Sequence, residues 1–448
     1  MITKIVVSLL VFLFPLFGDE IEVHLASKHI NKMCKIYLAK LKQCDSHYYN
    51  EIDKILEYDF AHNGTTTLLS VDEEKQQCAH NKDKSIAFSS SNWSNYGAKF
   101  VIVPKIKNDN LYLNIFNVTT ASLKTLYPIQ LSGNIESDRL SIHQSADLLH
   151  EIITGRRGVS SKRILYSYQP KPQGITSDTW RSEIWEMGCD GGNKKQITEE
   201  NNYAITPIFL PNASSNNDYT FAYVTYKQGP PRIYISKRGQ KRGKPLITLR
   251  GNQFLPNFTS NGDKIAFISD ASGKTDLFVQ SFSNKTGIIG KPTQVYSFPG
   301  SVQASPSFSP DGNKIAFVSD KNGGPAIYII DLLKISKENR LQNITPLSKK
   351  IKNNNSPAWS PDGKKIAFSA KTNGVRQIWI YDIAAEEESQ LTVGLEDKEN
   401  PSWSSNSLHL IYNTTSPTFD IYIINLNQRE SIKLTDGQGV KHYPAFEQ

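Results

Sequence analysis

Alternating hydrophobic and polar residues fill most of the chain after residue 160, in a unit that recurs about every 50 residues. Each unit begins with a proline, any residue and an aromatic residue. The six heads of this kind are Pro207/Phe209, Pro256/Phe258, Pro306/Phe308, Pro357/Trp359, Pro401/Trp403 and Pro444/Phe446. The aromatic residues follow one another at steps of 49, 50, 51, 44 and 43 residues. This spacing predicts four-stranded propeller blades.

Three further segments follow each head, and their pattern is that of β-strands. The first alternates apolar and polar side chains, as in "KIAFIS" at 264, "KIAFVS" at 314, "KIAFSA" at 365 and "LHLIYN" at 408. A second apolar strand comes next, for example "AIYIID" or "QIWIYD", and a shorter one such as "IKLTD" ends the unit. Each unit therefore supplies one head strand and three more.

The order of heads and tails predicts how the ring closes. The first tail, "RILYSY" from Arg163, has no head before it, and the last head, "YPAFEQ", has no tail after it. The C-terminal strand should therefore complete the first blade, which removes exposed sheet edges. We expect a six-bladed β-propeller over residues 163–448, preceded by a linker at 155–162.

Residues 19–154 lack the repeat, and their pattern of apolar and polar residues predicts a mixed α/β domain. The predicted fold class of the whole chain is therefore α+β. Helices are expected over 27–43, over 48–64, and over 141–155, where Ser141 and Gln144 form a capping box and Gly155 ends the helix. Residues 98–118 predict a hairpin that turns at Asn108, Asp109 and Asn110.

The opening "MITKIVVSLLVFLFPLFGDE" predicts a secretory signal peptide over residues 1–18. An uncleaved anchor is the alternative, but the apolar run is shorter than the about 20 residues that a spanning helix needs. We therefore expect a soluble, exported protein.

An exported protein enters an oxidising compartment, where disulfides can form. The chain has four cysteines, which allow up to two disulfides or remain free and buried: Cys34, Cys44, Cys78 and Cys189. A Cys34–Cys44 bond is disfavoured if both residues lie along one helix, since their Cα atoms would be too far apart.

The formal net charge of +8 favours anionic partners or surfaces. Positive residues cluster in "GRRGVSSKR" at 155–163 and in "KRGQKRGK" at 237–244, and the second cluster has the pattern of a solvated hairpin tip. An exported chain without a recognition motif is not expected to bind nucleic acid.

The stretch Ser309-Pro310-Asp311-Gly312 could hold a nucleophile and a carboxylate, or it could be a turn. It recurs at 360–363 and in degenerate form at 259–262 and 404–407. A catalytic set is needed once, whereas a turn is needed in each blade, and Pro, Asp and Gly suit a tight turn. We interpret it as a turn.

No motif indicates an enzyme. The chain lacks a Gly-x-Ser-x-Gly elbow, a phosphate-binding loop, a His-Glu-x-x-His pair and a Cys-x-x-Cys pair. His143 and His150 are seven residues apart on one expected helix, too far to hold one metal, so they are interpreted as surface or core polar residues. We expect no catalytic residue, no metal, no cofactor and no small-molecule substrate.

Binding is the remaining use of the scaffold, since loops on a rigid scaffold commonly carry recognition. The segments just before four heads should meet on one face near the channel mouth. They are "GSVQAS" (300–305), "IKNNNS" (351–356), "LEDKEN" (395–400) and "GQGVKH" (437–442).

The order of an α/β domain, "HQSADLLHEIITGRRGVSSKRILYSY" (143–168) and "PSFSPDGNKIAFVSD" resembles the TolB family of the Tol-Pal envelope system. "ILEYDFAHNG" (55–64) is similar to a helix end of that family. The resemblance covers roughly 48–448. It implies a periplasmic, non-enzymatic adaptor that supports outer-membrane integrity and envelope constriction at cell division.

The resemblance also implies partners: the peptidoglycan-associated lipoprotein Pal on the propeller, a TolA-like inner-membrane protein on the mature N-terminus, and outer-membrane proteins. The residues that would face Pal are Val302, Gln303, Ser305, Asn355, Ser356, Asn400 and His442. Those that would face TolA are Asp19, Glu20, Ile21, Glu22 and Val23.

Two alternatives remain open at this point. One is an enzyme-associated propeller of the prolyl-oligopeptidase type that lacks its own catalytic domain. The other is a propeller that binds cell-wall glycan through its basic surface. A hydrolase partner would indicate the first, and sedimentation with purified cell-wall sacculi would indicate the second.

Overall fold

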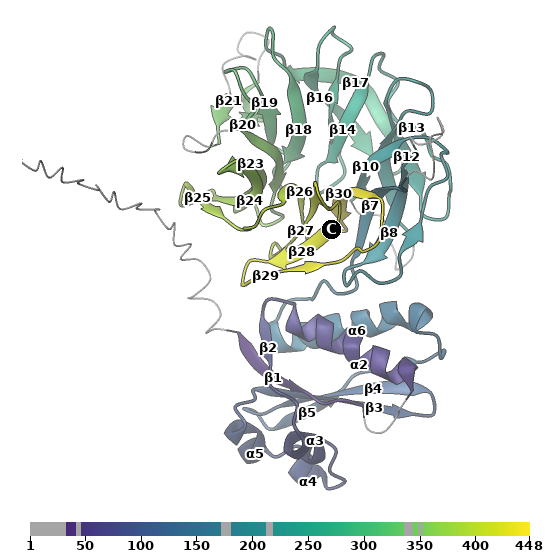
Figure 1. Ribbon diagram of the computed structural model, residues 1–448, viewed down its shortest axis with the longest axis vertical. Coiled ribbons are helices and arrows are strands. Elements are labelled where there is room, and N and C mark those ends of the chain that lie inside the picture. The colour runs from purple at the N-terminus through teal and green to yellow at the C-terminus, as the bar shows by residue number, and fades with distance from the viewer. Residues whose placement is uncertain are drawn as a thin grey trace, which may run out of the picture.

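The computed structural model describes residues 33–41, 46–171, 181–211, 218–335, 344–347, 351 and 353–448. A sheet-and-helix domain lies beside a ring of β-sheets (Figure 1). The predicted signal peptide and residues 19–23 lie outside the described residues, as does Cys44.

The ring is a six-bladed β-propeller, as predicted. Five blades have consecutive strand order, and the sixth has the order β30-β7-β8-β9, so the C-terminal strand closes the ring. The inner strands are β10 (Ala204–Phe209), β14 (Gln253–Phe258), β18 (Gln303–Phe308), β22 (Asn354–Trp359), β26 (Asp397–Trp403) and β30 (Val440–Phe446).

The outer three strands of each blade follow in antiparallel order. In the blade closed by β30 they are β7 (Arg163–Gln169), β8 (Glu183–Gly188) and β9 (Lys195–Gln196). The second strands of the others are β11 (Thr220–Thr225), β15 (Lys264–Ser269), β19 (Lys314–Ser319), β23 (Lys365–Thr372) and β27 (His409–Thr415). The third are β12 (Arg232–Lys237), β16 (Asp276–Ser283), β20 (Ala326–Asp331), β24 (Val375–Asp382) and β28 (Ile421–Asn425), and the outermost are β13 (Lys244–Pro245), β17 (Gly287–Tyr296), β21 (Ile344–Pro346), β25 (Glu387–Gln390) and β29 (Gln428–Lys433). A short helix, η2 (Leu332–Lys334), follows β20.

The residue before each head proline has the same unusual backbone in all six inner strands. Its φ lies between 47° and 54° at Thr206, Leu255, Ser305, Ser356, Asn400 and Tyr443. The pairing of the inner strand with its neighbour shifts register at this point in every blade. A bulge of this kind re-aims a side chain, and a left-handed non-glycine residue persists only where its surroundings fix it. The bulge turns the residue before each proline toward the centre of the ring, where it lines the channel.

The Ser-Pro-Asp-Gly stretch is a turn, as predicted. The N–H of Gly312 donates to the carbonyl of Ser309 at 2.8 Å, and Gly312 has a φ of 67°. The Ser309 hydroxyl accepts from the N–H of Lys314 at 2.9 Å, which fixes the first residue of β19. We call this end of the propeller, where the inner strands end, the turn face, and the opposite end the loop face.

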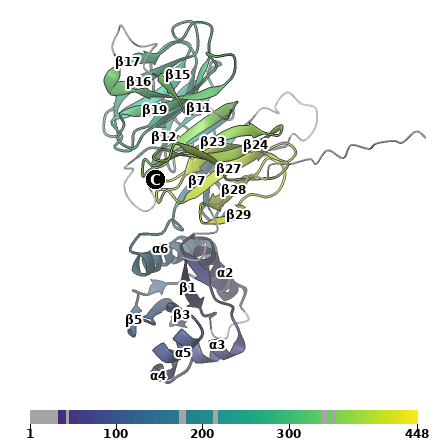
Figure 2. The same ribbon diagram turned by 90° about the vertical axis from the view of Figure 1, so that its left-hand side faces the viewer.

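The N-terminal domain is a mixed sheet with helices on both sides. Its strand order is β2-β1-β3-β4-β5, and β6 pairs with β4. The strands are β1 (Cys34–Leu38), β2 (Thr66–Leu68), β3 (Phe100–Lys107), β4 (Asn110–Asn117), β5 (Ser122–Thr125) and β6 (Ile129–Gln130). The helices are α2 (His47–Ala61), α3 (Glu73–Ala79), α4 (Lys84–Ala87), α5 (Ser90–Asn95) and α6 (Ile135–Thr154). Helices α2 and α6 lie between the sheet and the propeller, and α3 to α5 lie on the far side (Figures 1 and 2).

The helix expected over 27–43 was wrong, because residues 34–38 form the interior strand β1, between β2 and β3. This strand pairs in parallel with β2 and β3, and Ile36, Tyr37 and Leu38 are all buried. A strand covered on both faces is apolar at every position, so a short apolar run fits either structure. Because Cys34 begins a strand, helical spacing no longer disfavours a Cys34–Cys44 bond. Among the described cysteines, Cys34, Cys78 and Cys189 are free.

The second long helix begins earlier than the predicted capping box. Helix α6 starts at Ile135, and the side chain of Asn134 caps it by accepting from the N–H of Ser137 at 3.1 Å. Ser141 is therefore an interior residue. Asn, like Ser, is a preferred N-cap, because its short side chain can accept from a free N–H of the first turn. The other end is as predicted, since Gly155 has a φ of 75°.

A buried ionic cluster joins the two domains. The ring of His143 on α6 contacts the Asp59 carboxylate on α2 at 2.8 Å and that of Asp190 at 3.4 Å. Asp190 belongs to the turn after β8 in the propeller, and Arg139 of α6 also pairs with it. Burial opposes a charged imidazole, but the two carboxylates outweigh it and raise the pKa of His143 to about 10. His143 is therefore a core polar residue, one of the two predicted options.

The end of helix α2 is also capped by the propeller. Carbonyl groups in the last turn of a helix have no partner within the helix. Here Gln428 donates its side-chain amide to the carbonyl of Ala61 at 2.7 Å, and Nε2 of His409 lies 2.9 Å from the backbone carbonyl oxygen of His62. Asn427 donates to the carbonyl of Gly64 at 2.6 Å. These contacts, together with the ionic cluster, fix the N-terminal domain on the turn face.

Candidate partner-binding face and central channel

Among the predicted site residues that the structure describes, Val302 is the one that is well exposed on the loop face. Its relative exposure is 53%, and its N–H donates to the side chain of Asp320 at 2.7 Å. That bond holds the loop before β18 in place. A large apolar side chain displayed from a fixed loop can enter a pocket of a partner with little loss of conformational entropy.

Gln303, in contrast, is in the interior of the propeller. It is 1% exposed, and its side-chain amide donates to the carbonyl and the hydroxyl of Ser301 at 3.3 and 2.9 Å. It therefore supports the loop that carries Val302. The structure gives it no surface to present to a partner.

Three predicted residues come together in the wall of the channel. Ser305, Ser356 and Asn400 are the left-handed residues before three head prolines, and all three line the central cavity. The Ser356 hydroxyl donates to the side-chain oxygen of Asn400 at 3.1 Å, and the Asn400 amide donates to Asn413 at 2.9 Å. Ser356, Asn400 and Asn413 therefore form a connected polar row along part of the channel wall.

The remaining two predicted residues flank this row. Asn355 is half-buried, and its side chain accepts from the N–H of Ser356 at 3.3 Å. His442 is half-buried against the ring of Phe419, at 5.4 Å between centroids. Burial lowers the pKa of His442 to about 4, so this ring is neutral at pH 7.

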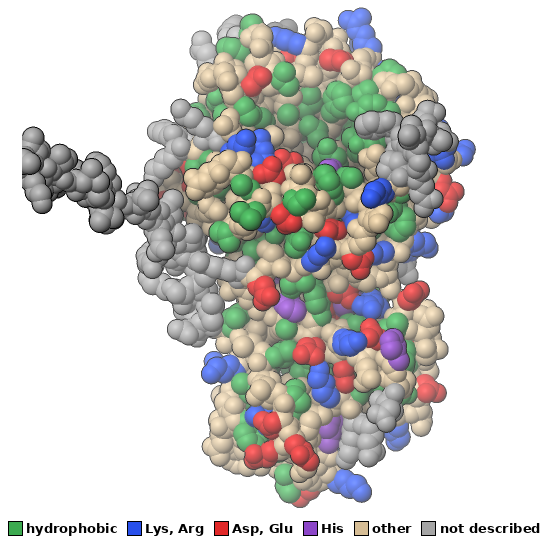
Figure 3. Space-filling model, viewed as in Figure 1, with side chains coloured by type: hydrophobic (Ala, Val, Ile, Leu, Met, Phe, Trp, Pro, Cys, Tyr) green, Lys and Arg blue, Asp and Glu red, His purple; other side chains and the backbone are tan. Residues whose placement is uncertain are grey.

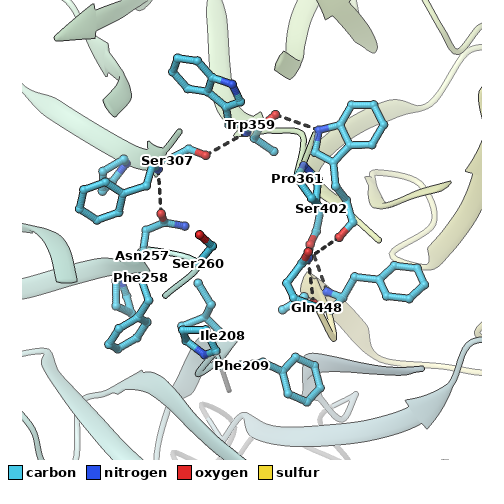
Figure 4. Close-up of a pocket in the computed structure, with 18 of the residues that line it drawn as sticks. Ile208, Phe209, Asn257, Phe258, Ser260, Ser307, Trp359, Pro361, Ser402 and Gln448 are labelled. Carbon is cyan, nitrogen blue, oxygen red and sulfur yellow. Dashed lines mark hydrogen bonds between the residues drawn. The ribbon is translucent and has the colours of Figure 1, made fainter. Parts of the chain in front are cut away.

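The central cavity has a volume of about 530 Å³ and follows the inner strands to the turn face. Its wall combines the six head prolines with aromatic rings such as Trp359 and with Ser and Asn side chains (Figure 4). Hydrophobic side chains gather on the propeller half of the visible surface (Figure 3). Volumes of 300–1,000 Å³ with mixed apolar and polar walls are typical of ligand sites.

Hydrogen bonds link neighbouring blades around this cavity, and three of them use the side chain of the residue between the head proline and the aromatic. Asn257 accepts from the N–H of Phe308 at 2.9 Å, Ser307 from that of Trp359 at 2.9 Å, and Ser402 from that of Phe446 at 3.1 Å (Figure 4). At the same position Ile208, Ala358 and Ala445 have no polar side chain. These channel residues were not predicted, because the sequence pattern treated this position as open to any residue.

The loop before β26 includes the predicted segment at 395–400, but its two exposed apolar residues were not among the predicted site residues. Val393 is 79% exposed and Leu395 is 94% exposed. Gly394 between them has a φ of 126°, a region that disfavours other residues, and its carbonyl accepts from the side chain of the buried Gln377 at 2.9 Å. The loop therefore directs its carbonyls inward and its two largest apolar side chains outward. An apolar residue on each side of a glycine in a polar loop was the available signal.

Within the described ranges, no three His, Cys, Asp or Glu residues come together as a metal site. No helix among these residues is long and apolar enough to cross a membrane.

Comparison with known proteins agrees with this architecture. The family model of the TolB beta propeller domain matches residues 150–448. The Protein TolB homolog of Protochlamydia amoebophila is 38% identical over 386 residues, which are 85% of this chain and 82% of the relative. The Protein TolB homolog of Chlamydia caviae is 39% identical over 273 residues, which are 61% of this chain and 62% of that relative.

A solved structure shares the fold of both domains. The crystal structure of TolB from Acinetobacter baumannii superposes with a TM-score of 0.73 at 22% identity, and the match covers 92% of this chain and 96% of that chain. The family model covers more than half of the chain, and the Protochlamydia relative matches most of it. The chain belongs to the TolB family.

Proposed function

We propose that this protein is a non-enzymatic adaptor of a Tol-Pal envelope system. It works in the periplasm, after removal of residues 1–18. Its loop face binds the lipoprotein Pal, and residues 19–23 bind a TolA-like inner-membrane protein. In this role it supports outer-membrane integrity and constriction at cell division.

The proposal rests on the apolar side chains that are exposed on the loop face. Val302, Val393 and Leu395 are exposed there, on loops whose backbone is held by Asp320 and Gln377. Single exposed apolar residues are common, but side chains held in fixed positions on one face are typical of protein-binding surfaces. Membership of the TolB family gives the expected partner, and the predicted signal peptide gives the compartment.

The test measures binding of the soluble domain of the cognate Pal to the mature protein by isothermal titration calorimetry. The double substitution Val393→Ser and Leu395→Ser should weaken Pal binding by about tenfold or more, because each side chain loses apolar burial in the complex. Leu333→Ser is the matched control, since Leu333 is 76% exposed in η2 and lies away from the loop face. It should leave the affinity unchanged.

A wild-type protein that does not bind Pal would contradict the proposal. Equal losses in the control and the double variant would place the Pal site elsewhere on the surface. The N-terminal part is tested separately by deleting residues 19–23. The deletion should abolish binding of the soluble part of the cognate TolA-like protein and leave Pal binding intact.

A further inference from the structure

The basic segment at 237–244 lies outside the central cavity, on a hairpin formed by the end of β12 and by β13. Figure 1 shows these two strands on the outer side of the ring. Because β12 runs antiparallel to β11, which begins at the turn face, the tip of the hairpin is at the turn face. The segment contains five Lys and Arg residues and no Asp or Glu.

The segment that joins β9 to β10 fixes the backbone of this hairpin. The N–H of Gly243 donates to the buried carboxylate of Glu200 at 2.8 Å. The N–H of Glu199 donates to the carbonyl of Lys241 at 2.7 Å. The fit is close, since a Cβ at Gly243 would lie 2.4 Å from the hydroxyl of Tyr223. The cations of the hairpin are therefore carried on a backbone with a defined position.

Few carboxylates neutralise these cations. Arg238 pairs with the buried Glu186 at 2.9 Å, and Lys241 pairs with the exposed Glu199 at 2.9 Å. Asp218, just before β11, is exposed and makes no ion pair with a hairpin cation among the described residues. Three exposed cations of the hairpin remain without an ion pair in the described part of the chain: Lys237, Arg242 and Lys244.

The three unpaired cations are spread over the hairpin. Lys244 lies opposite Ile235 in the sheet, and Lys237 is two residues beyond Ile235 on β12. Paired residues and residues two apart share a face of a sheet, so Lys237 and Lys244 lie on one face. Arg242 is in the turn, where its Nε donates to the carbonyl of Glu199 at 3.3 Å. The terminal N–H groups of its guanidinium remain available to a ligand.

This arrangement favours an extended anionic surface as the ligand. A small anion needs several donors that converge on one point, whereas these cations are spaced along two strands and a turn. A sugar ring needs a wall or an aromatic platform, and the segment at 237–244 has no aromatic residue. A membrane with anionic headgroups offers phosphates across its whole surface, so each separate cation can find one.

We propose that this hairpin binds the surface of a membrane that contains anionic phospholipid. The formal net charge of +8 supports attraction to such a surface. Clusters of about four to eight Lys and Arg residues are typical of binding to anionic headgroups, and each cation near the surface raises the affinity about fivefold. The hairpin is at the opposite end of the propeller from the loop face. A protein held by the hairpin would therefore keep its loop face free.

The experiment measures co-sedimentation of the mature protein with vesicles made of equal parts of phosphatidylglycerol and phosphatidylcholine. Vesicles of phosphatidylcholine alone and purified cell-wall sacculi are tested in parallel. In about 0.1 M NaCl, we expect at least about tenfold tighter binding to the anionic vesicles than to the neutral ones. In about 1 M NaCl the screening length falls to about 3 Å, so this difference should disappear.

The decisive variant replaces the three unpaired cations: Lys237→Gln, Arg242→Gln and Lys244→Gln. It should bind the anionic vesicles at least about tenfold more weakly than the wild type. The matched control removes the same charge from exposed positions on β3 and β5 of the N-terminal domain: Lys105→Gln, Lys107→Gln and Lys124→Gln. It should bind like the wild type.

Three results would overturn the proposal. The first is equal binding of the wild type to anionic and neutral vesicles in low salt. The second is an equal loss in the two triple variants, since the attraction would then depend on net charge alone. The third is tighter binding to sacculi than to anionic vesicles, weakened by the hairpin variant, since the ligand would then be the cell wall. The comparison of vesicles and salt on the wild type decides the question even if a variant does not fold. Pal is absent from these measurements, so this proposal and the proposed function can fail separately.

Discussion

Asp190 provides a direct test of how the two domains are joined. It is the propeller's contribution to the buried ionic cluster, where its carboxylate pairs with Arg139 and contacts the ring of His143 at 3.4 Å. Its other oxygen accepts from the N–H of Gly192 at 2.9 Å. Burial alone would raise the pKa of Asp190, but His143 and Arg139 outweigh it and hold the pKa well below its usual range. Asp190→Ala should therefore leave two cations at the interface without this partner.

The expected cost follows from the burial of the groups. The side chain of Asp190 is 6% exposed and that of Arg139 is 17% exposed. Removal of one partner from a buried ion pair costs about 3–5 kcal/mol. Arg139 retains some contact with water, and His143 retains Asp59, so we expect the lower end of this range, about 3 kcal/mol.

The assay is equilibrium unfolding in guanidinium chloride, followed by tryptophan fluorescence and far-ultraviolet circular dichroism. Two domains need not unfold together, so the loss of coupling should also separate the transitions seen by the two probes. Asp436→Ala is the matched control. Asp436 pairs with Lys194 at 3.6 Å, but its side chain is 88% exposed, and such surface pairs contribute about 0–1 kcal/mol.

The reasoning is refuted if Asp190→Ala costs no more than Asp436→Ala while the two probes still report one shared transition. That outcome would mean that the capping contacts at the end of α2 hold the domains together without the ionic cluster. A loss of about 3 kcal/mol in the variant alone would support the cluster as the main connection.

Three further outcomes are expected. The pKa of His143 is about 10 in the folded protein, above its ordinary value of 6.5. Protonation of His143 therefore stabilises the folded protein fully below pH 6.5, and this stabilisation is lost as the pH rises through 10. The stability difference between the wild type and His143→Gln should thus narrow between pH 7 and 10 in denaturant titrations, and a constant difference would contradict this. Gly191→Ala should lower the free energy of unfolding by about 1–3 kcal/mol, because Gly191 has a φ of 80° and an added Cβ would lie 2.5 Å from the carbonyl oxygen of Leu434. An unchanged thermal midpoint would contradict this expected loss of stability. Ser402→Ala removes the acceptor for the N–H of Phe446 in the closing strand, so it should lower the free energy of unfolding in denaturant titrations by about 1–3 kcal/mol. An unchanged free energy of unfolding would show that water replaces the bond.

The propeller was predictable because the same sequence unit recurs in each blade. Six heads at regular steps, alternating strands and one unmatched tail leave few ways to close a ring, and the pairing of β30 with β7 follows from that count. The Ser-Pro-Asp-Gly turns were equally readable, since turn chemistry acts within a few residues. The N-terminal domain has no repeat, and there the helix over 27–43 was wrong.

The candidate site was only partly predictable, for a reason that concerns single residues. The sequence placed Gln303 and Val302 together as contacts of a partner, yet one is 1% exposed and the other is 53% exposed. Neighbours along a chain can face opposite ways, and burial depends on residues brought in from other blades. Asn257 gave no local sign of its role, because its partner Phe308 belongs to the next blade.

The repeat, the number of blades, the closing strand and the turns could all be read from the sequence, because periodicity and turn chemistry are local properties of the chain. The folded arrangement alone shows that residues 34–38 are an interior strand, that Asp59, His143 and Asp190 meet across two domains, and that Asn257 bonds Phe308 of the next blade. Each of these depends on the distance between residues far apart in sequence. Burial, electrostatic pairing and the use of a hydrogen-bond acceptor are set by those distances.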